Sequence, residues 1–295
     1  MAESNQGEIY FTIPEAPAIP GLRFRYFRGE EDYPLMKSVF DSCKEVDGIE
    51  YALTVEAIAH NYKNLQRSDP FKDLIFAEFD GEPIAYSRVG WYPEEDGDHI
   101  YYTLGWIKPE WRRMGIGTAI LMHNERRLRM IANEHPENVK KWFQNDYEMQ
   151  QEGVAALLKA NGYEEMRWGY RMGRPLGDPL PEAPMPEGLE VRPVKEKEIR
   201  QIWEAMYDAF SESWGFVAWT DEDYSRFLSS PTHNPELWKV AWDGDEVAGM
   251  VLNFVNEAEY EQYGVRRGGT DPVCVRKPWR RQGLARSLLV QSILM

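Results

Sequence analysis

The strongest constraint on the fold is an internal repeat that runs through the chain. The string IKPEWRRMGIG at Ile107–Gly117 is answered by VRKPWRRQGLA at Val275–Ala285. A repeat this long cannot be a solenoid unit, so we expect a tandem duplication in which each copy folds as its own domain. Three further matches keep the same order at offsets near 167 residues: PEAPAIPGL with PEAPMPEGL, Arg25 and Asp41 with Arg192 and Asp208, and FDGEPIA with WDGDEVA.

The repeat also predicts the domain boundaries. We expect an N-terminal domain over residues 21–175, a Pro-rich linker over 176–187 and a C-terminal domain over 188–295. The offset projects the counterpart of the first copy's last strands to about residue 340, so we expect the second copy to be C-terminally incomplete. Either the sequence is a fragment of a longer protein, which we favour, or another chain completes the second domain.

Hydrophobic periodicity in the first copy alternates between helices and strands. The Asp-Gly pairs at Asp80-Gly81 and Asp243-Gly244 each predict a β-hairpin. The predicted class is therefore α/β of the α+β type, with two tandem domains that each have a mixed central sheet flanked by helices. We expect helices over residues 31–43, 55–65, 118–133 and 150–160, strands over 22–27, 74–79, 83–91, 100–107 and 139–144, and a closing strand pair over 163–172.

The segment that carries chemistry is the strand, loop and helix around Trp111–Gly117. Helix N-termini leave backbone N–H groups unpaired, glycines allow a ligand to approach the backbone, and the adjacent arginines add positive charge. This combination predicts a site for an anion such as pyrophosphate. The glycines do not form a full dinucleotide fingerprint, because Ile120 stands at the third glycine position, and no Walker lysine follows.

The pattern R-x-x-G-x-G/A between a strand and a helix resembles the coenzyme A-binding motif of the GNAT superfamily of N-acetyltransferases. Arg112, Gly115 and Gly117 fit it in the first copy, and Arg280, Gly283 and Ala285 fit it in the second. KANGY at Lys159–Tyr163 resembles the family's signature at the end of its fourth helix. Two such domains in one chain resemble the tandem GNAT architecture typified by mycothiol synthase, without specifying that substrate.

The resemblance implies an acyltransferase that moves an acetyl group from acetyl-CoA, as acyl-donor cosubstrate, to a primary amine of a small, cationic molecule. It implies that the pantetheine arm pairs with the strand before each loop and that the pyrophosphate rests on the loop N–H groups. The cofactor-binding residues implied in this way are Trp106, Ile107, Arg112, Arg113, Met114, Gly115, Ile116, Gly117 and Thr118 in the first copy, and Cys274, Val275, Arg280, Arg281, Gln282, Gly283, Leu284, Ala285 and Arg286 in the second.

The usual catalytic groups of the family are missing from the first copy. Leu158 stands where many GNATs place the tyrosine that protonates the coenzyme A thiolate. Tyr102 or Tyr147 is a geometric substitute, although a strand tyrosine is more often a packing residue. The first copy is therefore expected to bind coenzyme A with little or no catalysis.

The second copy offers Asp271 as a carboxylate that accepts the amine proton or orients a water, with a turn residue as the equal alternative. Cys274 is interpreted as an inert core thiol rather than a nucleophile. The aromatic and acidic segment Ser211–Asp223 suits a cationic amine, and an ordinary helix start at Thr220 is the slightly favoured alternative. Other functions left open are a non-catalytic acyl-CoA-binding or scaffolding protein and a protein N-terminal or lysine acetyltransferase.

Charge and composition limit the partners. Lys+Arg 34 against Asp+Glu 49 gives a formal net charge of −15, which disfavours nucleic acid and anionic membranes as partners. The five histidines show no ligand spacing, so we predict no metal. With two cysteines and no long apolar run, the chain is expected to be a cytoplasmic monomer or homodimer that acts on a small-molecule amine.

Overall fold

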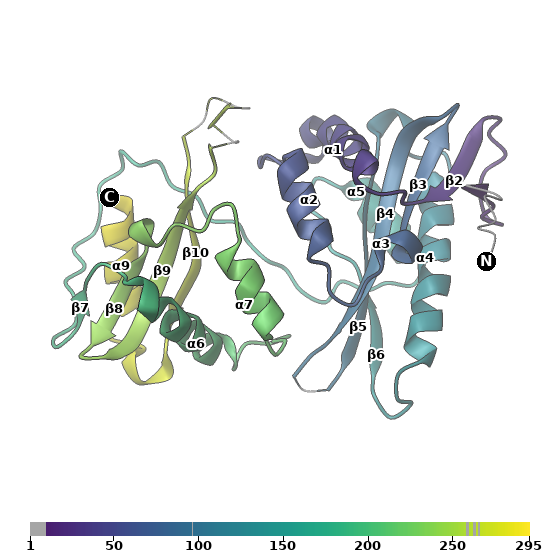
Figure 1. Ribbon diagram of the computed structural model, residues 1–295. Helices are drawn as coiled ribbons and strands as arrows, with labels where there is room; N and C mark the ends of the chain where they lie inside the picture. Colours follow the sequence, from purple (N-terminus) through teal and green to yellow (C-terminus); the bar gives the residue numbers. More distant parts are fainter. Residues whose placement is uncertain (1–9, 96, 258–259, 262–263, 265) are drawn as a thin grey trace, which may run out of the picture. The chain divides into compact units, whose positions relative to one another are not determined.

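The computed structural model describes residues 10–95, 97–257, 260–261, 264 and 266–295, and the chain divides into two compact units, residues 1–167 and 168–295 (Figure 1). Within the described residues, the first unit contains a six-stranded sheet in the order β1-β2-β3-β4-β5-β6. Its strands are β1 (Tyr10–Phe11), β2 (Leu22–Tyr26), β3 (Leu74–Phe79), β4 (Glu82–Pro93), β5 (His99–Ile107) and β6 (Lys141–Gln144). Neighbouring strands are antiparallel except β5 and β6, which are parallel.

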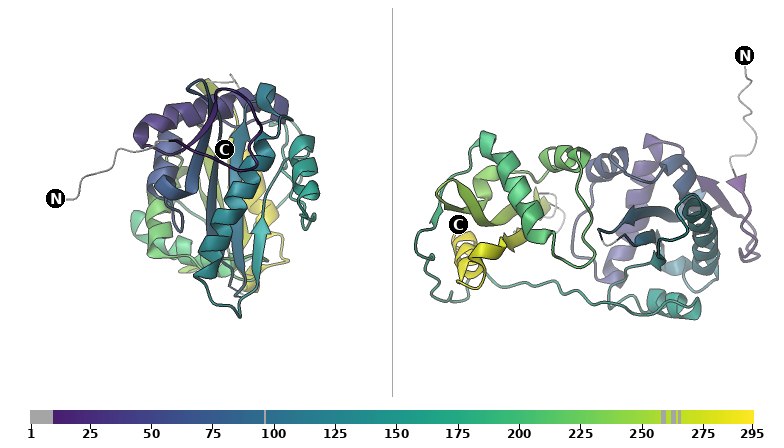
Figure 2. Two further views of the ribbon diagram at one scale, coloured as in Figure 1. Left: turned by 90° about the vertical axis from the view of Figure 1, so that its right-hand side faces the viewer. Right: turned by 90° about the horizontal axis from the view of Figure 1, so that it is seen from below.

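Helices cover both faces of the first sheet. Met36 and Val39 of α1 (Tyr33–Asp47) and Ile58 of α2 (Val55–Lys63) pack on one face. Ile116 and Ala119 of α4 (Ile116–Asn133) pack on the other, and Figures 1 and 2 show α4 running along the sheet. The short helix α3 (Pro70–Asp73) precedes β3, and α5 (Glu152–Ala160) follows β6. The 3-10 turns η1 (Glu30–Asp32) and η2 (Pro109–Trp111) precede α1 and the loop before α4.

The parallel strands β5 and β6 part from each other halfway along β5. Their pairing runs from His99 beside Lys141 to Tyr102 beside Gln144 and then stops. Just beyond that point, Asn145 Nδ2 donates a hydrogen bond to the Thr103 carbonyl at 3.2 Å. The last residues of β5 therefore present an open edge on the side away from β4.

The second unit repeats this plan in the part of the chain that the structure describes. Its four-stranded antiparallel sheet has the order β10-β9-β8-β7. One face is covered by α6 (Ile199–Phe210) and α7 (Asp221–Leu228), and the other by α9 (Leu284–Ile293). The strands are β7 (Glu190–Val191), β8 (Lys239–Asp243), β9 (Glu246–Val255) and β10 (Gly268–Val275), and the 3-10 turns are η3 (Glu196–Glu198), η4 (Pro235–Leu237) and η5 (Lys277–Trp279).

Both predicted hairpins are confirmed. Asp80 and Gly81 join β3 to β4 with φ of 49° and 88°, and Gly244 turns β8 into β9 with φ of 56°. The predicted strand pair over residues 163–172 is wrong, because residues 161–189 form neither helix nor strand. The alternating apolar residues of that segment are not buried: Met166 is 74% and Tyr170 84% exposed. Alternation alone does not make a strand when the apolar side chains are not buried against a sheet.

Candidate functional site

The two arginine-glycine loops have the same backbone conformation. Arg113 and Arg281 lie in the left-handed region with φ of 63° and 65°, and Gly115 and Gly283 both have φ of 88°. Each loop follows a 3-10 turn and leads straight into a helix, α4 or α9. Two loops 168 residues apart therefore reach one geometry, which is strong support for the duplication.

The start of each helix is open to an anion. The N-cap residue is Gly115 in α4 and Gly283 in α9, and neither has a side chain to accept a hydrogen bond from the first turn. Arg113, Met114 and Gly115 are exposed, as are Arg281, Gln282 and Gly283. Exposed backbone N–H groups at a helix N-terminus, beside left-handed residues, suit phosphate oxygens. The residues present therefore fit the diphosphate of coenzyme A.

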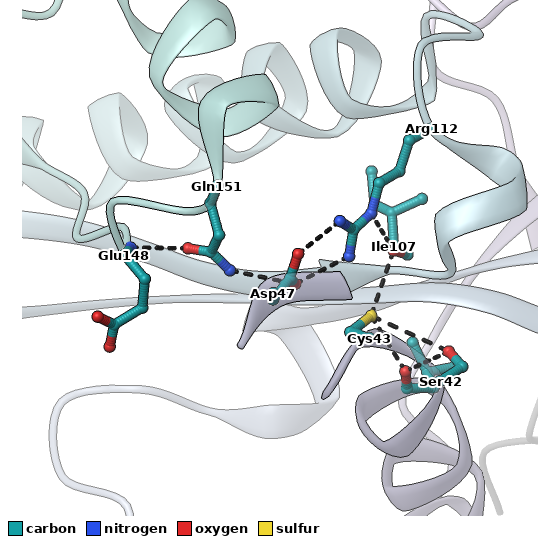
Figure 3. Close-up of polar contacts among 8 residues, drawn as sticks. Ser42, Cys43, Asp47, Ile107, Arg112, Glu148 and Gln151 are labelled. Atoms are coloured by element: carbon teal, nitrogen blue, oxygen red, sulfur yellow. Dashed lines mark hydrogen bonds and ion pairs between the residues drawn. The ribbon is translucent and has the colours of Figure 1, made fainter. Parts of the chain in front are cut away.

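Each motif arginine holds its loop through side-chain hydrogen bonds, and Figure 3 shows those of Arg112. Arg112 donates from Nε to the Ile107 carbonyl at 2.9 Å and forms a bidentate ion pair with Asp47 at 2.6 and 2.9 Å. Arg280 donates from Nε to the Val275 carbonyl, also at 2.9 Å, and from Nη1 to Glu212 at 3.1 Å. Arg113 and Arg281 are the adjacent arginines whose side chains remain exposed at the loop.

The first loop is fastened through a buried carboxylate. The side chain of Asp47 is 3% exposed and also accepts a hydrogen bond from Gln151 Nε2 at 3.2 Å, which connects the loop to the start of α5 (Figure 3). Cys43 Sγ donates to the same Ile107 carbonyl at 3.3 Å. The hydrogen bonds that Arg112 donates to Asp47 raise the pKa of Arg112, and burial raises the pKa of the Cys43 thiol. Neither Asp47 nor Gln151 was recognisable as a loop contact from the sequence.

The second loop is fastened at the surface. The Glu212 side chain is 49% exposed and is shared between Arg280 and Lys277. The hydrogen bond from Lys277, followed by that from Arg280, lowers the pKa of Glu212. Arg280 Nη2 donates in addition to the Ala209 carbonyl near the end of α6 at 3.0 Å.

The strand ends before the loops show which backbone groups face outward. Lys108 donates its N–H to Ile84 of β4, and Arg276 donates its N–H to Ala248 of β9. Successive strand residues point their polar groups to opposite sides. The backbone N–H and C=O groups of Trp106 therefore face β4, and those of Cys274 face β9. The backbone polar groups of Ile107 and Val275 face the opposite side, away from these strands. The carbonyls of Ile107 and Val275 are held by the motif arginines.

The catalytic candidates lie in different surroundings. Tyr102 stands at the point where β5 and β6 part, and its hydroxyl accepts a hydrogen bond from Arg88 Nη1 at 3.0 Å. Asp271 is an exposed residue of β10, at the irregularity in register between Thr270 and Val273. Tyr147 lies elsewhere and donates to Glu165 at 2.8 Å. Leu158 is buried and 5% exposed.

Cys274 is suited to packing rather than to nucleophilic chemistry. Its side chain is 8% exposed and belongs to the core between α6 and the second sheet. Burial raises the pKa of its thiol to about 12, so the thiolate is scarce at neutral pH. This agrees with the interpretation of Cys274 as a core thiol.

The segment Ser211–Asp223 borders a cavity in the second unit. The alternative interpretation of its end is confirmed, since Thr220 and Asp223 form a capping box at the start of α7. The cavity measures about 370 Å³, and Arg200 pairs there with both Glu204 at 2.9 Å and Asp221 at 3.0 Å. Its lining includes Trp203, Tyr207 and Trp219, with Arg200, Glu204 and Asp221.

Sequence comparison identifies the family. The acetyltransferase (GNAT) family model matches residues 35–134 and 203–293, one match in each unit. The chain belongs to the GNAT family of acetyltransferases. The predicted fold of two tandem GNAT domains is thereby confirmed. Each match contains one arginine-glycine loop and the whole helix that follows it, α4 in the first and α9 in the second.

Curated relatives agree with the family, and a solved structure shares the fold. The mycothiol acetyltransferase of Geodermatophilus obscurus is 33% identical over 181 residues, which cover 60% of this chain and 54% of that protein. That of Catenulispora acidiphila is 26% identical over 159 residues, which cover 54% of this chain and 48% of that protein. The chain thus spans about half the length of the curated relatives it matches. A GCN5-related N-acetyltransferase from Sphaerobacter thermophilus shares the fold with a TM-score of 0.65 and 23% identity, covering 93% of this chain and 82% of that one.

Two further findings concern metals and membranes. No group of three or more His, Cys, Asp or Glu side chains is placed to hold a metal ion among the described residues. Within the same described part of the chain, every helix is too short or too polar to cross a membrane.

Proposed function

We propose that the protein transfers an acetyl group from acetyl-CoA to a primary amine of a small molecule. The observation that carries this proposal is the pair of arginine-glycine loops, each with exposed N–H groups at an uncapped helix start next to the end of a sheet strand. Membership of the GNAT family supports acetyl-CoA as the donor. The relatives named mycothiol acetyltransferase support a small-molecule acceptor.

The reaction makes three chemical demands on the protein. The attacking amine must be neutral, the thioester oxygen needs a hydrogen-bond donor as it gains negative charge, and the departing thiolate needs a proton. We assign the acceptance of the amine proton to Asp271, which is exposed on β10 and reachable by water. The high pKa of Cys274 supports direct transfer from the thioester to the amine, without an acetyl-cysteine intermediate.

We place turnover in the second unit and a supporting role in the first. In the first unit, Leu158 of α5 occupies the position where many family members have a tyrosine that protonates the coenzyme A thiolate, so this unit lacks a general acid there. The two loop entrances also differ. A side chain built on Gly115 would lie 3.6 Å from Pro17, whereas one built on Gly283 would meet no atom of the described residues within 4 Å.

The test is acetyl-CoA-dependent thiol release by the full chain with a panel of small primary amines. We expect turnover with at least one amine and none with acetyl-CoA alone beyond slow hydrolysis. A matched pair of substitutions, Gly283→Trp and Gly283→Asn, separates blockage of the loop from backbone strain, because asparagine tolerates the left-handed conformation.

The second candidate function is a non-catalytic acyl-CoA-binding module, and the buried Leu158 favours it for the first unit. Calorimetry distinguishes the two candidates. Tight coenzyme A binding by the full chain without turnover across the amine panel would support the binding module and contradict the enzyme.

A further inference from the structure

One buried cation of the first unit has no place in the function proposed above. Arg88 of β4 is 7% exposed, and its guanidinium carbon lies 5.6 Å from the ring centre of Tyr62 and 5.4 Å from that of Tyr102. Nη1 donates to the Tyr102 hydroxyl at 3.0 Å. Nε is buried and has no hydrogen-bond partner in the structure.

The other buried or half-buried arginines of this unit show what Arg88 lacks. Arg25 is paired with Asp32 and Glu78, and Arg112 is paired with Asp47. Arg127 is paired with Asp73 at 2.8 Å. For Arg88, the described residues offer tyrosine hydroxyls and rings but no carboxylate. Because an arginine cannot lose its proton in a protein, its charge stays buried without an opposite charge.

A buried charge without a counter-ion is costly. Desolvation of an unpaired ion costs several kcal/mol in folded proteins, about as much as a typical domain can lose before it unfolds. Cation–π contacts with two tyrosines offset only part of this cost. The arrangement is therefore better suited to a state in which an anion completes it.

Arg88 lies close to the point where β5 and β6 stop pairing. Its partner on the adjacent strand β5 is Leu104. Tyr102, two residues earlier, is the last residue of β5 that is paired with β6. Tyr62 belongs to α2, so the three side chains lie on the face of the sheet that α1 and α2 cover. Burial raises the pKa of the Tyr62 hydroxyl, which therefore stays protonated and able to donate a hydrogen bond.

We propose that Arg88, together with Tyr62 and Tyr102, binds an oxyanion group of a small molecule, a carboxylate or a phosphate, in the first unit. The planar guanidinium can give such a group two parallel N–H hydrogen bonds, of which the buried Nε–H is one. This site goes beyond the proposed acetyl transfer and gives the first unit a ligand-binding role of its own.

The test observes the Nε–H group of Arg88 directly. Arginine Nε signals of the full chain, labelled with ¹⁵N, are followed by NMR during separate titrations with sodium phosphate and sodium acetate at constant ionic strength. The Arg88 signal is assigned by its loss in Arg88→Gln. We expect this signal to shift saturably, and we expect at least tenfold weaker binding of the same anion by Arg88→Gln in calorimetry.

Three variants keep the test decisive. Arg129→Gln is the matched control, because Arg129 is an exposed residue of α4 that pairs with Glu125 on the other side of the sheet. Tyr102→Phe keeps the guanidinium but removes one hydroxyl of the site, so it is expected to bind the anion several-fold more weakly. It carries the test if Arg88→Gln does not fold, and unchanged binding by Tyr102→Phe would then contradict the proposed site. Arg88→Lys keeps the positive charge but loses the two parallel N–H donors of the guanidinium, so it is expected to bind the anion several-fold more weakly.

Each outcome has a meaning. A response to phosphate alone identifies a phosphorylated ligand, and a response to acetate alone identifies a carboxylate ligand. If no anion moves the Arg88 signal saturably, or if Arg88→Gln binds both anions as wild type does, the proposal is overturned. Phosphate binding at the arginine-glycine loops would leave the Arg88 Nε signal unmoved, and it is distinguished from the proposed site in this way. Since no acetyl-CoA is present, failure of the proposed acetyl transfer would leave this result unchanged.

Discussion

The two arginine-glycine loops share a backbone but not the contacts that hold them. In both, the motif arginine bonds the carbonyl of the last strand residue at 2.9 Å, and the loop glycine has φ of 88°. In the first unit the guanidinium then meets the buried Asp47, and in the second it meets the half-exposed Glu212. The short signature thus determines the loop conformation, while residues outside it determine how firmly the loop is attached.

The difference arises from helix length. α1 ends at Asp47 and α6 ends at Phe210, which is about one turn earlier in the numbering of the repeat. The extra turn brings Asp47 beside Arg112. In the second unit the shorter helix leaves the Ala209 carbonyl and Glu212 to contact Arg280.

The largest expected effect is on the first loop. Asp47→Ala leaves Arg112 without its buried partner and is expected to lower the free energy of unfolding by about 3 kcal/mol. Glu212→Ala is the matched change in the second unit. It is expected to lower the free energy of unfolding clearly less, because exposed ion pairs are screened by water. Urea unfolding of both variants measures the difference. Equal losses would show that the two attachments are equivalent.

A second difference concerns His123 of α4, whose counterpart in the repeat is Gln291. Burial, and then Arg126, lowers the pKa of His123 to about 4, and its ring stacks on Phe11 of β1 at 5.0 Å. Because the folded pKa lies below the usual value of 6.5, stability is complete above pH 6.5 and is lost as the pH falls toward 4.

Because the His123 side chain is partly exposed, the expected loss in free energy of unfolding is about 1 kcal/mol. Thermal melting between pH 7 and 4.5 is expected to show an acid-sensitive contribution that His123→Gln removes, making the first unit like the second at this position. An unchanged pH dependence in that variant would contradict the assignment to His123.

The surface attachment of the second loop should depend on pH and salt. The folded pKa of Glu212 is lowered by Lys277 and Arg280, so its stabilising effect is present above the unfolded value near 4.5 and is lost as the pH falls through the folded value. Hydrogen exchange of residues 275–286 is expected to accelerate slightly in acid or in 1 M salt. Glu212→Gln should exchange at the faster rate under all these conditions.

The smallest effect is expected where the two motifs differ in sequence, at Gly117 and Ala285. A Cβ on Gly117 would lie 3.3 Å from Ile107 and 3.4 Å from Leu157, tight contacts that small side-chain shifts relieve. Alanine stabilises a helix by up to about 1 kcal/mol relative to glycine, and this stabilisation offsets the crowding. Gly117→Ala should therefore change the free energy of unfolding by less than about 1 kcal/mol. A larger loss would show that the first helix start is less tolerant than the second.

The sequence was sufficient for the features that depend on local pattern. The duplication, the hairpins at Asp80-Gly81 and Asp243-Gly244, and the helix after each loop follow from spacing and turn chemistry, and the structure contains all of them.

What the sequence did not predict depends on distant contacts. Asp47 is 65 residues from Arg112, and its partner position cannot be inferred from the repeat, because Glu212 aligns with Glu45 instead. The charge on Arg88 looks ordinary in a strand until the burial of β4 is known. The alternation over residues 163–172 predicted strands, but no sheet edge receives them among the described residues.

The most direct test of the account compares the two loops in turnover. Thiol release from acetyl-CoA is measured for Gly283→Trp and Gly115→Trp, with Gly283→Asn and Gly115→Asn as controls for backbone strain. We predict that Gly283→Trp lowers turnover by about a hundredfold, because the donor is displaced from its position, and that Gly115→Trp stays near wild type. Full activity in Gly283→Trp together with an inactive Gly115→Trp would contradict the assignment of catalysis to the second unit.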